Sequence, residues 1–162
     1  MGYSQDEISF SVLEISQAIG KGEPFIKLAK ALGIQWYMMA DGDRVGSDYI
    51  GRANDHLADD ENIANRAQKL SHPDVEHEFW HNGYDDFISN MVDAARKHTI
   101  EQQSAGNENE KIKLLIKAAI KYAGGKPAFA HLLAEEVKRR GSDTIPQTIK
   151  TVINRVVELA ED

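Results

Sequence analysis

The sequence predicts an α/β fold in which a parallel sheet flanked by helices precedes an all-helical C-terminal subdomain. Short apolar runs alternate with helical patterns between residues 10 and 57, as in βαβ units. From residue 110 onward the apolar residues recur only at helical spacing. We therefore expect an α/β domain over residues 1–98, a polar linker over residues 99–109 (TIEQQSAGNEN) and a helical subdomain over residues 110–162.

The first part of the chain has the pattern of a strand, a helix and a second strand. Residues 10–15 (FSVLEI) are apolar and β-branched and predict a strand. The amphipathic stretch PFIKLAKAL predicts a helix that ends at Gly33. Residues 34–40 (IQWYMMA) show no alternation, as in a strand covered on both faces. Asp41 is then expected just past the carboxyl end of a buried strand, where open α/β sheets place their ligands.

The later elements are predicted to be helical. Residues 46–57 and, less regularly, residues 59–70 (DDENIANRAQKL) have helical spacing, and Asp85 or Asp86 is expected to cap a helix that runs to about His98. In the C-terminal subdomain we expect three helices: one with a buried apolar stripe, one from Pro127 to Arg140 followed by Gly141, and one opened by Pro146. The stripe comprises Ile112, Leu115, Ile116 and Ala119, and the last helix has one apolar face of Ile149, Val152, Ile153, Val156, Val157 and Ala160.

Composition excludes several classes of protein. The chain has no cysteine, which rules out disulfides, thiolate metal sites and thiol nucleophiles. No apolar run is long enough to span a membrane, and the first ten residues lack the pattern of a secretory signal, so we expect a cytoplasmic protein. The net charge of −7 is uneven, because residues 1–90 hold 16 acidic and 7 basic residues whereas residues 91–162 hold 10 and 12. The two parts are therefore expected to have different roles.

Two pairs of carboxylates are candidate metal ligands. Asp41 and Asp43 flank a glycine after the apolar run, and Asp74 and Glu76 have the same spacing beside aromatic residues. Oxygen ligands at this spacing can converge on Mg²⁺ or Mn²⁺. The alternative interpretation of each pair is a polar, solvated turn.

The stretch HEFWH formally matches the HExxH signature of zinc hydrolases, with His77 and His81 as ligands and Glu78 as base. That chemistry needs a substantial helix and a third ligand. Pro73 and Gly83 leave room for only about two helical turns here, which argues against a zinc site.

Lysines supply the candidate phosphate contacts. Lys126 lies between Gly-Gly and a proline that starts a helix, a position where the helix dipole disfavours a cation. It could neutralise a phosphate, or it could be an ordinary exposed loop lysine. Lys113, Lys117 and Lys121 recur every four residues and predict either a solvated helix face or a surface that contacts DNA phosphates.

These motifs together resemble the Toprim region of OLD-family (overcoming lysogenization defect) ATP-dependent endonucleases. The resemblance is carried, in order, by LGIQWYMMADGDRVGSDY, by the DVEH at residues 74–77, by Lys126-Pro127, and by Arg140-Gly141 with Ile145-Pro146. It covers nearly the whole chain, from about Phe10 to Ala160.

The resemblance implies a Toprim-like parallel sheet and a DNA endonuclease that nicks by two-metal phosphodiester hydrolysis with Mg²⁺ or Mn²⁺. It implies that Asp41, Asp43, Glu76 and, less directly, Asp74 are metal ligands. It further implies that Lys126 stabilises charge at the scissile phosphate, that Glu76 takes part in catalysis, and that an ATPase domain belongs to the same polypeptide. It assigns no role to His77.

The chain departs from this family at its start. The family's first strand, which ends in an essential glutamate, has no counterpart here, and no Walker A pattern occurs. We therefore expect weak or no nuclease activity from this chain alone. The alternatives are a non-catalytic Toprim-like module that contributes fold or homodimer contacts, and a receiver-like Mg²⁺-binding domain. Lys126 follows Gly-Gly rather than an apolar strand, which counts against a receiver domain.

Overall fold

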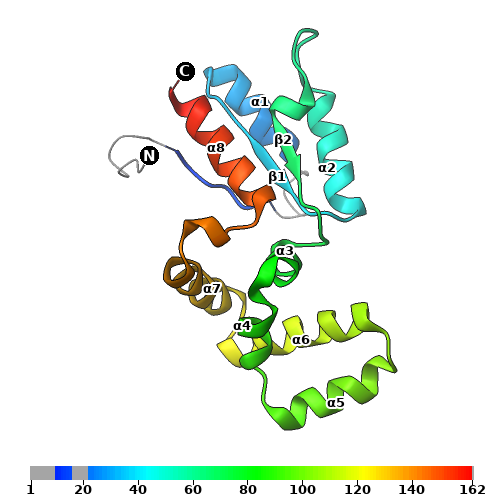
Figure 1. The fold of residues 1–162 in the computed structure, drawn as a ribbon. Helices are drawn as coiled ribbons and strands as arrows, with labels where there is room; N and C mark the ends of the chain where they lie inside the picture. The colour runs from blue at the N-terminus through cyan, green and yellow to red at the C-terminus, as the bar shows by residue number, and fades with distance from the viewer. Residues whose placement is uncertain (1–9, 16–21, 162) are drawn as a thin grey trace. The chain divides into compact units, whose positions relative to one another are not determined.

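The structure is a computed structural model that describes residues 10–15 and 22–161 (Figure 1). It is mostly helical and contains a small parallel sheet, so the broad expectation of helices around a parallel sheet is confirmed. The chain divides into two compact units. Unit 1 combines the residues up to Asp74 with those from Gln147 onward, and unit 2 comprises Val75–Pro146.

Within the described residues of unit 1, the sheet has two parallel strands, β1 (Met38–Ala40) and β2 (Ala67–Lys69). They are joined through α2 (Arg44–Asn54) and a short 3₁₀ turn (Ile63–Asn65), so the chain forms a βαβ unit. The predicted βαβ unit began with a strand at residues 10–15, whereas the observed unit begins with β1. The predicted strand of residues 34–40 is shortened to three residues, in which Met38 and Ala40 are buried but Met39 is 43% exposed.

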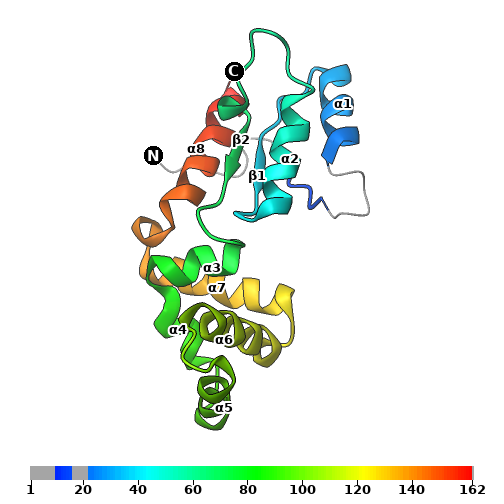
Figure 2. The same ribbon diagram turned by 90° about the vertical axis from the view of Figure 1, so that its right-hand side faces the viewer.

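Helices lie on both faces of this sheet. Figure 2 shows α8 (Gln147–Glu161) on one side of the strands and α1 (Glu23–Leu32) with α2 on the other. The small core between the strands, α1 and α2 contains Ile26, Met38 and Ala53. Helix α1 has Pro24 in its first turn and ends at Gly33, whose φ of 67° is left-handed, as predicted.

Two predictions for unit 1 were wrong. Residues 10–15 form no strand, and Phe10 and Val12 are 62% and 84% exposed, because β-branched composition gives a strand only where a neighbouring strand pairs with it. The predicted helix over residues 59–70 is the 3₁₀ turn followed by β2. The Asn62 side chain caps that single turn, and pairing with β1 then extends the chain.

Helix α8 follows Pro146, as predicted, and contacts β2. Its predicted apolar face is only partly covered, because Ile153 is 48% exposed and Ala160 is exposed, while the buried residue is Leu159.

Unit 2 is entirely helical in the residues that the structure describes. Its elements are α3 (Val75–Phe79), a π-helical segment (Trp80–Tyr84), α4 (Asp85–Asn90), α5 (Ala94–Ser104), α6 (Glu108–Ala123), α7 (Lys126–Arg140) and a 3₁₀ turn (Ser142–Thr144). The predicted stripe on α6 is buried, and Phe129 and Leu133 of α7 are buried as well. Helix α7 starts beside Pro127 and ends at Gly141, as predicted.

The helix predicted to run to about His98 is broken into two. Asp93 caps α5 by accepting a hydrogen bond from the Arg96 amide at 2.8 Å, so α4 and α5 are separate helices. The predicted loop at residues 99–104 was also wrong, since α5 continues to Ser104 with Ile100 fully buried. A largely polar composition did not prevent this helix, which buries Ile100 and Ser104.

The two units do not follow the predicted division at residues 98 and 110. Prediction followed chain order, whereas α8 packs with the early strands and α3 to α5 belong with α6 and α7. Among the described residues, no helix is both long and apolar enough to cross a membrane.

Candidate functional site

The turn that contains Asp41, Gly42 and Asp43 follows the carboxyl end of β1, and both aspartates are exposed. The Gly42 amide donates to the carbonyl oxygen of His72 at 3.0 Å. A Cβ atom at Gly42 would lie 2.0 Å from that same oxygen. The turn therefore needs glycine for space, because the chain leaving β2 runs directly against it.

Gly46 is required for a similar reason. A Cβ atom there would lie 1.9 Å from the carbonyl oxygen of Asp41, so the first turn of α2 packs directly on the backbone of the aspartate turn. Both glycines of the DGDxxG pattern thus have a structural explanation.

Asp43 has a structural role as well. It is the N-cap of α2, and its Oδ1 accepts a hydrogen bond from the Gly46 amide at 2.8 Å. The cap uses one of the two carboxylate oxygens. Capping and cation binding by Asp43 are therefore chemically compatible.

The remaining predicted ligand of unit 1 is Asp74, which is half-buried at the end of this part of the chain. Within residues 10–15 and 22–161, no group of three or more histidine, aspartate or glutamate side chains is arranged to hold a metal ion. In unit 1 the chemistry of the donors, two exposed carboxylates on a tight turn, suits a hard cation that keeps several of its waters.

In unit 2 the structure brings together two residues that the sequence singled out separately. Lys126 Nζ lies 3.1 Å from Glu76 Oε1 in an ion pair between α7 and α3. The Glu76 side chain is 14% exposed and that of Lys126 is 73% exposed. Because Lys126 starts α7, the carboxylate offsets the cost of placing a cation at a helix N-terminus.

The HEFWH stretch does not form one regular helix. Helix α3 ends at Phe79, His81 lies in the π-helical segment, and Asn82 and Gly83 have non-helical backbone angles. Glu78 is 2% exposed, so it lies away from the solvent that a general base would have to activate. These features argue further against a zinc hydrolase.

The three lysines of α6 that the sequence singled out, Lys113, Lys117 and Lys121, are exposed. Lys113 lies 3.4 Å from Glu110 on the same helix, an ordinary surface pair. The arrangement of Lys113, Lys117 and Lys121 suits a solvated helix face and a phosphate-contact surface equally well.

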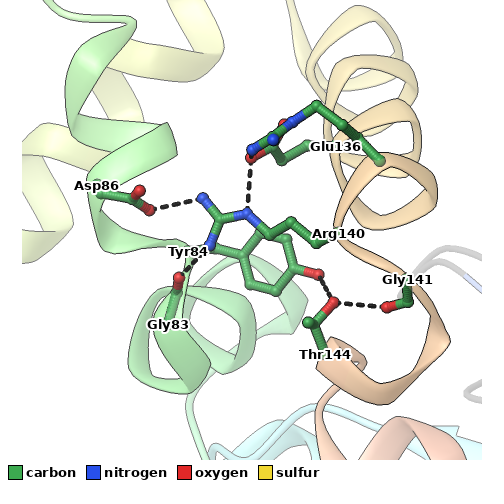
Figure 3. Close-up of polar contacts among 8 residues, drawn as sticks. Gly83, Tyr84, Asp86, Glu136, Arg140, Gly141 and Thr144 are labelled. Carbon is green, nitrogen blue, oxygen red and sulfur yellow. Dashed lines mark hydrogen bonds and ion pairs between the residues drawn. The ribbon is translucent and has the colours of Figure 1, made fainter.

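A network around Arg140, which could not be predicted from the sequence, links α7 to the start of α4 and the segment before it (Figure 3). The Arg140 guanidinium donates to the Gly83 carbonyl oxygen at 2.6 Å, to Asp86 at 2.8 Å and to Glu136 at 2.6 Å. It also lies 4.6 Å from the ring centroid of the fully buried Tyr84.

The same network extends to the end of α7. The Tyr84 and Thr144 hydroxyls lie 2.6 Å apart, and Thr144 donates to the Gly141 carbonyl oxygen at 2.7 Å (Figure 3). Hydrogen bonds from Arg139 and then Arg140 lower the pKa of Glu136 to about 2. The Arg140-Gly141 pair is thus part of a structural anchor in unit 2.

Lys69 is another residue that the sequence did not single out. It is the last residue of β2, and its Nζ donates to Ser47 Oγ in the first turn of α2 at 2.7 Å. The place of Lys69 next to Ala40 follows from the pairing of β2 with β1. The sequence prediction missed it because it assigned residues 59–70 to a helix.

The chain is similar to the uncharacterized protein YbjD of Escherichia coli (strain K12), with 30% identity over 161 residues. The alignment covers 98% of this chain and 27% of that protein, so the chain spans about a quarter of the relative's length. No protein-family model matches the chain, and no solved structure matches it. The similarity relates the chain to one portion of a longer protein and assigns it no activity.

Proposed function

We propose that this chain is the Toprim-like nuclease region of an OLD-type protein and takes part in metal-dependent nicking of DNA. The observation that carries the proposal is the position of Asp41 and Asp43 directly after the carboxyl end of a strand in a parallel βαβ unit. Ligands of open α/β sheets bind at that edge. The ordered motifs of the resemblance support the same assignment.

The proposal assigns a chemical role to each candidate residue. Asp41 and Asp43 hold a divalent cation, with Asp74 in support. Mg²⁺ or Mn²⁺, when bound, lowers the pKa of a water and stabilises charge on a phosphate oxygen. In unit 2, Lys126 stabilises charge at the phosphate, and Glu76 orients the Lys126 ammonium or serves as a further ligand.

The proposal also places an ATPase domain in the same polypeptide and DNA as the partner, with Lys113, Lys117 and Lys121 as phosphate contacts. Alignment with about a quarter of a longer relative is compatible with such an arrangement.

A second candidate function is a non-catalytic module that contributes fold or dimer contacts. One observation favours it: Gly42, Gly46 and Asp43 are each explained by packing or capping alone. A receiver-like domain is less favoured, because Lys126 starts a helix instead of following a strand.

The test measures Mn²⁺ binding to the 162-residue chain and nicking of supercoiled plasmid by the chain and by the longer polypeptide. Asp41→Asn is compared with Asp48→Asn, which removes the same charge from an exposed position on α2. We expect the Asp41 variant alone to weaken Mn²⁺ binding by about tenfold or more and to abolish nicking. If Mn²⁺ binding and nicking are both absent from the unmodified proteins, the non-catalytic module is the better assignment. If the two variants behave alike, Asp41 is not a ligand.

A further inference from the structure

Lys69 lies at the edge of the sheet where the aspartate turn begins. In the parallel register it is paired with Ala40, the residue that precedes Asp41. The side chain is half-buried and belongs to unit 1, as does the turn. A lysine is thus placed at the carboxyl edge of the sheet, where the chain leaves β1 for the aspartate turn.

A chain of two hydrogen bonds holds the ammonium there. Lys69 Nζ donates to Ser47 Oγ at 2.7 Å, and Ser47 Oγ donates to the carbonyl oxygen of Asp43 at 3.0 Å. Ser47 therefore uses its proton on the turn and accepts from the lysine. An ammonium has three donors, and this bond uses one of them.

The local structure of α2 does not require a cation at this position. The N-terminal turn of a helix carries partial positive charge, so a lysine held against it is unfavourable, whereas an anion bound there is stabilised. The hydroxyl of Ser47 is a neutral partner and does not compensate the charge of the ammonium. Asp43 caps this terminus and Asp41 lies on the same turn, and the divalent cation proposed there would offset the charge of both carboxylates. The helix N-terminus and the ammonium of Lys69 would then face one anion together.

We propose that Lys69 binds a non-bridging phosphate oxygen of the DNA backbone, and that Ser47 orients its ammonium. The ligand class is a phosphodiester. Lys69 is then a substrate-positioning residue beside the cation held by Asp41 and Asp43. This inference rests on the proposed function, because DNA is the substrate there.

The test measures binding of a short fluorescent duplex to the 162-residue chain by anisotropy, with Ca²⁺ present and over a series of salt concentrations. Lys69→Met is compared with Lys69→Arg and Ser47→Ala. The matched control is Lys27→Met, which removes an exposed lysine of the same unit that pairs with Glu23 on α1. Thermal melting of each variant confirms that it is folded.

Loss of one phosphate contact lowers the slope of log affinity against log salt by about 0.9 and the affinity at 0.1 M salt by about tenfold. We expect both effects for Lys69→Met and neither for Lys27→Met. Lys69→Arg should restore the slope, and Ser47→Ala should weaken binding without changing the slope. A purely structural role of Lys69 would not change the salt slope.

Three outcomes overturn the inference. If Lys69→Met and Lys27→Met bind DNA equally, Lys69 contacts no phosphate, while nicking and Mn²⁺ binding through Asp41 still stand as separate findings. If Lys69→Met raises Mn²⁺ affinity and leaves DNA binding unchanged, the lysine only compensates the two carboxylates. If the unmodified chain binds no duplex at low salt, both the inference and its DNA substrate are wrong.

Discussion

Replacement of Asp43 by asparagine and by alanine separates the structural role of this residue from its proposed chemical role. Asp43 Oδ1 accepts the Gly46 amide at 2.8 Å and caps an eleven-residue helix that covers the sheet. Loss of such a cap costs about 1 kcal/mol, and asparagine caps about as well as aspartate. We expect Asp43→Ala to lower the free energy of unfolding by about 1 kcal/mol, and Asp43→Asn to leave it nearly unchanged.

The two variants should behave alike in cation binding, because neither has a carboxylate at position 43. Urea unfolding followed by circular dichroism measures the first effect, and calorimetric titration with Mn²⁺ measures the second. For a chain of this size, about 1 kcal/mol corresponds to a shift of about 2–4 °C in Tm. If Asp43→Asn is as unstable as Asp43→Ala, the capping argument is wrong. If Asp43→Asn binds Mn²⁺ like the unmodified chain, Asp43 is not a ligand.

Three further predictions concern the glycines of α2, the arginine network and the lysine of α7. Gly46→Ala should lower the free energy of unfolding by about 1–3 kcal/mol, because the added Cβ would overlap the preceding turn. Gly51→Ala, in the same helix, places its Cβ in open space and should raise the free energy of unfolding by about 0.5–1 kcal/mol, so equal effects of the two variants in urea unfolding would contradict the close packing at Gly46. The pKa of Glu136 is lowered from 4.5 to about 2, so its contribution to stability is complete above pH 4.5 and is lost as the pH falls towards 2. In thermal melts, Glu136→Gln should therefore lose less Tm between pH 4.5 and 2 than the unmodified chain, and an equal loss would refute the role of Glu136. Lys126→Met should change folding little, because the Lys126 side chain is 73% exposed, yet lower nicking by the longer polypeptide about a hundredfold. The control Lys138→Met, at an exposed position on the same helix, should keep nicking intact, and equal loss in both variants would remove the special role of Lys126.

The helices that have proline or glycine at their ends were predictable from the sequence. Gly33 ends α1, Pro127 lies in the first turn of α7 and Gly141 ends α7, because these residues restrict the local backbone wherever they occur. The apolar stripe of α6 is buried for the same kind of local reason, its spacing. The positions of these helices depend on residues that lie within one or two helical turns along the chain.

The strands were less predictable because each depends on a partner far along the chain. Residues 67–69 become β2 only through pairing with β1, and residues 10–15 remain exposed despite strand-like composition. The break between α4 and α5 depends on a single cap at Asp93, which is easily missed in a continuous helical pattern.

The same distinction applies to the candidate site. We could predict from the sequence that Asp41 and Asp43 follow a strand, because they come directly after a strongly apolar run. The pairing of Glu76 with Lys126, the position of Lys69 and the network of Arg140 could not, because they depend on strand register and helix packing.

The structural roles found in the DGDxxG pattern change which residues count as signs of catalysis. Gly42 and Gly46 are needed for close backbone contacts, and Asp43 is needed as a cap, so a module without chemistry would also keep them. Gly46 packs against the carbonyl oxygen of Asp41, so this close contact does not involve the carboxylate of Asp41. That carboxylate is a proposed cation ligand, and comparison of Asp41→Asn with Asp48→Asn therefore separates a nuclease region from a structural module by their Mn²⁺ binding.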